Sequence, residues 1–137
     1  MPWRHLKNWV ANQLRKDNSF DLIGIVSYEF DEKAPENMYN NLTEVKDVAD
    51  LIIDFSHPNN LEDILTYAKK HKTKLVLATT GFTAKQLQQI EESSKELAIF
   101  QSYNTSFGVQ MVTKILRQVA KEFYDNGEME LYIAHTN

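Results

Sequence analysis

Hydrophobic residues occur along the chain in short, continuous runs that are separated by longer amphipathic segments. Largely apolar runs of four or five residues fall at residues 22–26, 51–55, 75–78 and 97–100. A continuous run of this length is typical of a strand that is buried on both faces, as in parallel sheets. Residues 129–133 alternate between apolar and polar side chains, which predicts one more strand.

The segments between these runs carry apolar residues at steps of three and four, which predicts amphipathic helices. Helices are expected over residues 2–16, from residue 59 or 60 to residue 71, from Thr83 to about residue 95, and from Gly108 through Phe123. Residues 27–41 are polar and predict a loop, and residues 42–48 predict a short helical turn. Strands that alternate with helices predict βαβ units and a mostly parallel, doubly wound α/β sheet.

Residues 74–83 join a predicted strand to a predicted helix through a turn of hydroxyls and glycine. The strand is followed by Thr79, Thr80 and Gly81, and Thr83 with Gln86 then forms a capping-box signature. A strand that leads through such a turn into a helix N-terminus is where open α/β sheets bind ligands, because the free amides favour anionic groups. The alternative is that this is an ordinary connection among several.

Composition narrows the class of protein. A chain of 137 residues fits one domain, and its net charge of -4 argues against a large surface that binds nucleic acid. The sequence contains no cysteine, which excludes disulfides and thiolate metal sites and is compatible with a reducing compartment. No apolar run approaches the roughly 20 residues that span a bilayer. We therefore expect a cytoplasmic protein without nucleic-acid or membrane partners.

Candidate chemistry falls in the loops that follow the predicted strands. In an open parallel sheet these loops share one edge, and here they are rich in hydroxyls and amides, with neither paired carboxylates nor a Gly-x-Ser-x-Gly turn. This favours a polar, phosphorylated cofactor over hydrolysis. No pair of histidines has metal-ligand spacing, so no metal site is expected.

Two histidines and one aspartate leave alternatives open. His5 and His71 fall on helix surfaces, whereas His57 and His135 follow strands and are candidates for catalysis. Asp54, late in a strand, could be the phosphoacceptor of a receiver-like domain. Such a domain also needs an acidic pair after its first strand and a lysine after its last, and neither stands in the right place.

Four motifs together resemble one enzyme family. They are residues 53–58 (Ile-Asp-Phe-Ser-His-Pro), 78–82 (Ala-Thr-Thr-Gly-Phe), 104–109 (Asn-Thr-Ser-Phe-Gly-Val), and Glu130 with residues 134–137 (Ala-His-Thr-Asn). In this order and at similar spacings they resemble 4-hydroxy-tetrahydrodipicolinate reductase, also called dihydrodipicolinate reductase, of lysine (diaminopimelate) biosynthesis in bacteria and plants. The resemblance covers nearly the whole chain from about Trp3.

The resemblance implies a Rossmann-like domain that binds NADPH or NADH, and a second α/β domain that binds substrate and builds a homotetramer. The implied reaction is hydride transfer from the nicotinamide to a cyclic dicarboxylate substrate, giving tetrahydrodipicolinate, with a histidine as proton donor. In the family pattern His135 matches this proton donor, and Thr136 stands where a second histidine meets the substrate. The positions that match the cofactor site are Ser27, Phe55, Ser56, Ala78, Thr79, Thr80, Ser102, Tyr103, Asn104 and Thr105.

The sequence departs from the family at both ends. The family begins with a strand and a Gly-rich loop before the first helix, and continues past residue 137 to a lysine and a Pro-Ser-Gly-Thr segment. We therefore expect residues 1–127 to form a partial dinucleotide-binding domain, and residues 128–137 to be the first strand of a truncated substrate and tetramerisation domain. The chain would then be a fragment with impaired activity, and the alternative is a non-catalytic α/β remnant or binding module.

The absent first strand has a structural consequence. In this topology it lies between the strands at residues 22–26 and 51–55, which would leave a central gap nearly 10 Å wide. Unpaired backbone groups inside a sheet are costly. The two strands therefore close up and pair, another segment fills the gap, or the chain is a piece of a longer protein.

Overall fold

The computed structural model describes residues 3–18, 20–27, 38–101, 114 and 129–135. Its α-helices are α1 (Trp3–Lys16), α2 (Leu61–His71) and α3 (Ala84–Ser93), and two single-turn 3-10 helices are η1 (Leu42–Glu44) and η2 (Pro58–Asn60). Its strands are β1 (Phe20–Ser27), β2 (Met38–Tyr39), β3 (Leu51–Asp54), β4 (Lys74–Leu77), β5 (Ile99–Gln101) and β6 (Met129–His135).

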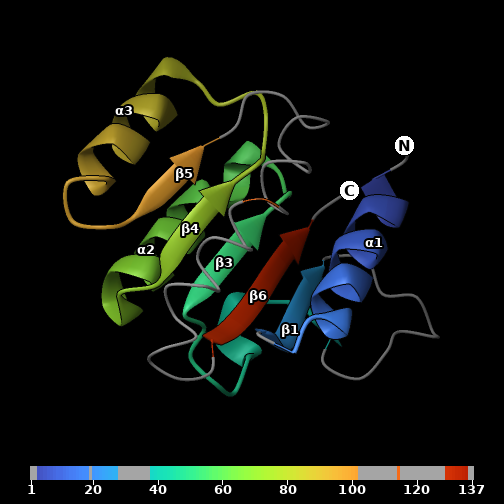
Figure 1. Cartoon of the computed structure of the whole chain (residues 1–137). Helices are drawn as coiled ribbons and strands as arrows, with labels where there is room; N and C mark the ends of the chain where they lie inside the picture. Colours follow the sequence, from blue (N-terminus) through green and yellow to red (C-terminus); the bar gives the residue numbers. More distant parts are fainter. Residues whose placement is uncertain (1–2, 19, 28–37, 102–113, 115–128, 136–137) are drawn as a thin grey trace.

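The six strands form one sheet in the order β2-β1-β6-β3-β4-β5. Every neighbouring pair is parallel (Figure 1). From the central strand β6, the sheet extends through β1 to β2 on one side, and through β3 and β4 to β5 on the other. This confirms the predicted doubly wound, Rossmann-like α/β fold. The helix predicted from Gly108 through Phe123 lies outside the described residues, except for Lys114, which is helical.

Strand β6 fills the centre of the sheet. It pairs with β1 on one side and with β3 on the other, with Ile133 opposite both Ile25 and Ile53. The sequence left three outcomes open for the gap between the strands at residues 22–26 and 51–55. In the structure another segment, β6, fills this gap. Residues 129–135 therefore belong to the same sheet as the rest of the described chain, while their assignment to a second domain stays a prediction.

Hydrophobic side chains cover both faces of the sheet, because successive residues of a strand point to opposite faces. On one face, Val10, Ala11 and Leu14 of α1 pack with residues of the strands that include Ile53 and Val76. On the other face, the apolar stripes of α2 and α3 pack with residues that include Ile52, Leu75 and Leu77. Figure 1 shows α1 and α2 on the two sides of the sheet.

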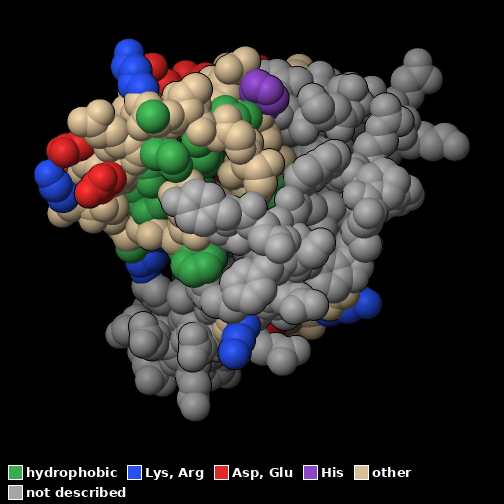
Figure 2. Space-filling view, turned by 90° about the horizontal axis from the view of Figure 1, so that it is seen from above, with side chains coloured by type: hydrophobic (Ala, Val, Ile, Leu, Met, Phe, Trp, Pro, Cys, Tyr) green, Lys and Arg blue, Asp and Glu red, His purple; other side chains and the backbone are tan. Residues whose placement is uncertain are grey.

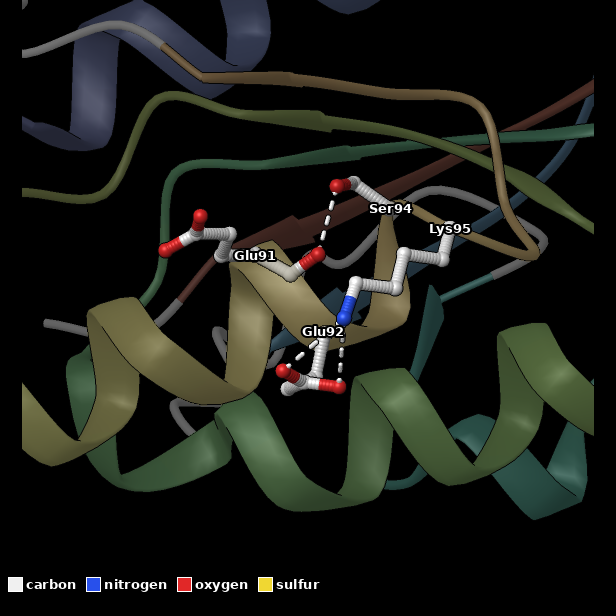
Figure 3. Close-up of polar contacts among 4 residues, drawn as sticks. All are labelled: Glu91, Glu92, Ser94 and Lys95. Atoms are coloured by element: carbon white, nitrogen blue, oxygen red, sulfur yellow. Dashed lines mark hydrogen bonds and ion pairs between the residues drawn. The ribbon is translucent and has the colours of Figure 1, made fainter.

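The first turn of α3 has the predicted capping box. Thr83 Oγ1 accepts a hydrogen bond from the Gln86 amide at 3.2 Å, and Gln86 Oε1 accepts one from the Thr83 amide at 3.0 Å. At the other end of α3, the Ser94 hydroxyl donates to the Glu91 carbonyl and Lys95 Nζ contacts both carboxylate oxygens of Glu92 (Figure 3). The ends of this helix are therefore fixed locally.

One strand was not predicted. Met38 and Tyr39 form the short edge strand β2 beside Ile25 and Val26, where the polar composition of residues 27–41 predicts only a loop. Residues 28–37 of that predicted loop lie outside the described part of the chain. A strand of two residues is too short to show alternation in sequence, so no periodic signal marks it.

Candidate functional site

The carboxyl ends of the parallel strands bring the polar loops to one edge of the sheet. The register places Asp54 opposite Leu77 and Ala134, Leu77 opposite Gln101, and Ser27 opposite His135. Figure 2 looks onto this edge and shows polar and backbone atoms around green hydrophobic side chains, with charged side chains toward the margin. The edge is therefore the one at which open α/β sheets bind their ligands.

A cavity of about 600 Å³ opens at this edge, between the turns after β3 and β4. This is within the range of small-molecule sites, about 300 to 1,000 Å³. Its lining comes from the strand-end turns, from η2, from the first turn of α2 and from the first two turns of α3. The lining residues are Phe55, Ser56, His57, Pro58, Asn59, Glu62, Thr80, Gly81, Thr83, Lys85, Gln86 and Gln89.

Asp54 lies directly beneath this cavity and connects its two turns. Its side chain is 1% exposed. Oδ1 accepts a hydrogen bond from the Ser56 amide at 2.8 Å, and Oδ2 accepts one from the Thr79 hydroxyl at 2.9 Å. Burial raises the pKa of the Asp54 carboxyl above its ordinary value, because burial penalises the charged form, and the interactions with Ser56 and Thr79 offset part of that effect.

The same burial argues against Asp54 as a phosphoacceptor. A phosphoacceptor carboxylate has to meet its phosphodonor, whereas both oxygens of Asp54 are engaged below the surface. The described residues also contain no group of three acidic, histidine or cysteine side chains that could hold a metal ion. The structure therefore argues against the receiver-like alternative, which requires Asp54 to accept a phosphoryl group.

His57 begins the turn that precedes α2. Its Nδ1 accepts a hydrogen bond from the Asn59 amide at 3.2 Å, which caps η2. In the neutral ring the proton is then on Nε2, which makes this nitrogen a hydrogen-bond donor. The exposed imidazole thus offers a donor to a ligand in the cavity.

One hydrogen bond and one backbone conformation define the walls of the cavity. Gln86 Nε2, from α3, donates to the Pro58 carbonyl at 2.8 Å. Gly81 has φ of 85°, a left-handed conformation that strains any residue with a Cβ atom. The turn after β4 therefore needs glycine at this position, and α3 is tied directly to the turn after β3.

The sequence of this sheet matches one known family. The family model described as "Dihydrodipicolinate reductase, N-terminus" matches residues 10–105. The chain belongs to the dihydrodipicolinate reductase family. Its matched residues include β1 to β5 and both turns that form the cavity, so the family resemblance seen in the sequence is confirmed.

Three relatives in this family are each named 4-hydroxy-tetrahydrodipicolinate reductase. The relative from Exiguobacterium sibiricum is 51% identical over 79 residues, which are 58% of this chain and 32% of the relative. Those from Clostridium novyi and Alkaliphilus oremlandii are 35% and 32% identical, over 88% and 97% of this chain and 49% and 51% of their own length. The chain thus spans about a third to a half of the relatives it matches.

The predicted cofactor, catalytic and substrate residues of this family member fall into three groups. Ser56 and Thr80 line the cavity, and so does Phe55, although its side chain is 1% exposed. Ser27, Ala78 and Thr79 are buried under the edge, at 2% exposure or less. Residues 102–105 and Thr136 lie outside the described residues, and the backbone of His135 ends β6 opposite Ser27.

Sequence reasoning did not single out several polar residues of the cavity. Glu62 belongs to the first turn of α2, and Lys85, Gln86 and Gln89 belong to the first two turns of α3, not to a strand-end loop. The capping box was the available signal, since a glutamine that reaches back to its cap also faces the turn before the helix. Among the described residues, no helix is long and apolar enough to cross a membrane.

Proposed function

We propose that this chain forms the dinucleotide-binding part of an NAD(P)H-dependent 4-hydroxy-tetrahydrodipicolinate reductase that acts in the cytoplasm, in lysine (diaminopimelate) biosynthesis. The observation that carries the proposal is the hydroxyl-lined cavity at the carboxyl edge of a doubly wound sheet whose sequence matches this family. The names of the relatives supply the reaction.

The described residues have groups that suit a phosphorylated dinucleotide. Ser56 lines the cavity, and its buried hydroxyl has no hydrogen-bond partner within the described part of the chain. The Thr80 side chain is exposed there, and Lys85 adds a positive charge. When bound, the nicotinamide dinucleotide would supply the hydride.

The buried residues of the turn after β4 have a different part in this proposal. Because the side chains of Ala78 and Thr79 point away from solvent, we expect these residues to meet the dinucleotide through their backbone groups. Residues 102–105 follow β5, and Gln101 pairs with Leu77 in the sheet. We propose that these four residues form a second cofactor loop at the same edge.

The proton donor and the substrate contact belong to the end of β6. We propose that His135 protonates the cyclic dicarboxylate substrate and that Thr136 contacts it. Support comes from the register, since Ala134 lies opposite Asp54 and His135 opposite Ser27, at the edge that carries the cavity. By the family resemblance, Ser27 stands where an acidic residue usually meets the adenosine ribose. A serine there has no carboxylate to repel a 2′-phosphate, so the proposal covers both NADPH and NADH.

We also propose a division of the chain between two domains. Residues 1–127 would belong to the dinucleotide-binding domain, whose sheet β6 completes, and residues 128–137 would connect this domain to a substrate domain that assembles a homotetramer. The support is that residues 10–105 match an N-terminal family model, and that the relatives from Clostridium novyi and Alkaliphilus oremlandii are about twice as long as the part aligned with this chain.

The proposal is tested by titrating the purified chain with NADPH and NADH and following nicotinamide fluorescence. We expect saturable binding of at least one of them, and a melting temperature that rises with its concentration, since a ligand that binds only the folded state stabilises it. Adenosine monophosphate should compete weakly. An unchanged fluorescence and melting temperature at millimolar dinucleotide would refute cofactor binding by this chain.

A second candidate is a dinucleotide-binding module without turnover, which is favoured by the fraction of each relative that the chain covers. The two candidates differ in one measurement. A reductase oxidises NADPH or NADH when substrate is generated in the assay, whereas a module binds the dinucleotide and leaves the absorbance at 340 nm unchanged.

A further inference from the structure

The carboxylate of Asp54 is placed so that it touches both turns that form the cavity. It stands at the last position of β3, and its two oxygens go to different segments: Oδ1 to the Ser56 amide and Oδ2 to the Thr79 hydroxyl. Ser56 itself lines the cavity, and Thr79 directly precedes Thr80, which lines it too. The Asp54 side chain is thus hydrogen-bonded to one lining residue, Ser56, and to Thr79, the neighbour in sequence of another.

The backbone supports the same connection. The Asp54 carbonyl accepts a hydrogen bond from the Ala78 amide at 2.8 Å, which continues the β3–β4 ladder past the last paired residues. The carboxylate extends this link from the ladder into the two turns, where no ladder exists. Relative movement of the walls therefore requires that one of the two side-chain contacts breaks.

A buried carboxyl at this position is costly for stability. Desolvation of the group opposes folding, and apolar side chains of similar size in place of buried charged groups often leave proteins as stable or more stable. The buried Thr79 hydroxyl donates its only proton to this carboxylate and not to solvent or a ligand. A geometric role at the edge accounts for both features.

We infer that Asp54 is a positioning residue that holds the turn after β3 and the turn after β4 at the spacing a dinucleotide requires. This inference rests on the function proposed above. Asp54 does not contact the ligand, and it acts through Ser56 and Thr79. Its removal should therefore change dinucleotide affinity in excess of any change in stability.

The chain offers a matched pair of threonines for the test. Thr73 and Thr79 flank the same strand, β4, and their side chains are 1% and 2% exposed. Thr79 donates to the Asp54 carboxylate at 2.9 Å, whereas Thr73 donates to the Ala49 carbonyl at 2.8 Å, at the opposite edge of the sheet. Valine in place of either threonine removes one buried hydroxyl at nearly constant volume.

The experiment compares Thr79→Val with Thr73→Val, and Asp54→Leu with Asp54→Asn, by dinucleotide titration and thermal melting. Asparagine keeps an acceptor for the Ser56 amide and can donate to the Thr79 hydroxyl, so it should rescue positioning. We expect Thr79→Val and Asp54→Leu to weaken binding about tenfold, the effect of losing about one charge-assisted hydrogen bond. Thr73→Val and Asp54→Asn should stay within about threefold.

Two results would overturn the inference. One is equal dinucleotide affinity of Thr79→Val and Thr73→Val at similar melting temperatures, and the other is wild-type affinity of Asp54→Leu. Either would mean that Asp54 serves the stability of the sheet alone.

A failure of the proposed function itself is recognised separately. If the wild-type chain binds neither NADPH nor NADH, cofactor binding is refuted, and amide hydrogen exchange in the ligand-free protein then decides the role of Asp54. Protection of the Ser56 amide that is lost in Asp54→Leu and Thr79→Val, but kept in Thr73→Val, supports positioning of the turns. Protection that is unchanged in all three variants contradicts it.

Discussion

Asp54 is the one acidic side chain, among those the structure describes, that is fully buried. Its environment combines desolvation, which favours the protonated acid, with hydrogen-bond donors that favour the carboxylate. Because desolvation dominates, the pKa of the carboxyl is raised in the folded protein. This residue therefore links the proton concentration to the stability of the fold.

The first prediction concerns this linkage. A raised folded-state pKa means that the stability contributed by Asp54 is fully present below the unfolded-state pKa, ordinarily 3.8, and is lost as pH rises through the folded-state pKa. Asp54→Asn cannot ionise. The difference in free energy of unfolding between Asp54→Asn and wild type should therefore increase in favour of the variant as pH rises from about 3 to 7.

Urea denaturation of both proteins at several pH values measures this difference, in which the contributions of the other acids largely cancel. A difference that is constant over the whole range would show that Asp54 titrates alike in both states. A difference that changes in favour of the wild type as pH rises would show that the fold stabilises the carboxylate, and the folded-state pKa of Asp54 would then be lowered instead of raised.

The second prediction concerns Lys85. This exposed residue lines the cavity, whereas Lys95 near the end of the same helix pairs with Glu92 (Figure 3). Lys85→Gln should weaken dinucleotide binding up to about fivefold at low salt, since exposed charge pairs are worth at most about 1 kcal/mol. The effect should shrink as salt is added. Lys95→Gln is the matched control, and equal affinities of the two variants would exclude an electrostatic role for Lys85.

At the scale of elements, the sequence predicted those strands and helices whose own hydrophobic pattern is enough to identify them. Continuous hydrophobicity predicts that the runs around Ile53 and Val76 are buried, and periodic hydrophobicity predicts the same for the apolar stripe of α2. The two-residue strand β2 has no such pattern. The sequence placed Thr79 in the predicted cofactor turn but gave no direction for its side chain, which faces Asp54, because that direction depends on a partner 25 residues away in sequence.

The third prediction concerns the capping box of α3. Thr83→Ala removes the acceptor of the Gln86 amide and should lower the free energy of unfolding by about 1 kcal/mol, the usual value of an N-cap side chain. Thr83→Ser keeps the hydroxyl and should cost a few tenths at most. Urea midpoints measure both. Because Gln86 also donates to the Pro58 carbonyl, Gln86→Ala should cost more than the loss of the cap alone, and a smaller cost would contradict this coupling.

At the scale of the whole molecule, β6 joins two halves of the sheet. One half contains β1 and β2, and the other contains β3, β4 and β5. In the described part of the chain β1 and β3 do not pair with each other, so both halves meet at β6. The strand that carries His135 is therefore also the strand on which the continuity of the sheet depends.

The fourth prediction follows from this position. Ile133→Pro removes an amide from a strand that is paired on both sides, and it should lower the free energy of unfolding by about 3 kcal/mol or more, because proline is excluded from central strands. Met38→Pro places the same residue in the edge strand β2, which pairs on one side only, and should cost clearly less. Urea denaturation with a fluorescence probe measures both costs. Equal losses in the two variants, or a stable Ile133→Pro protein, would mean that β6 does not occupy the centre of the sheet in solution, and His135 would then lose its place at the carboxyl edge of the sheet.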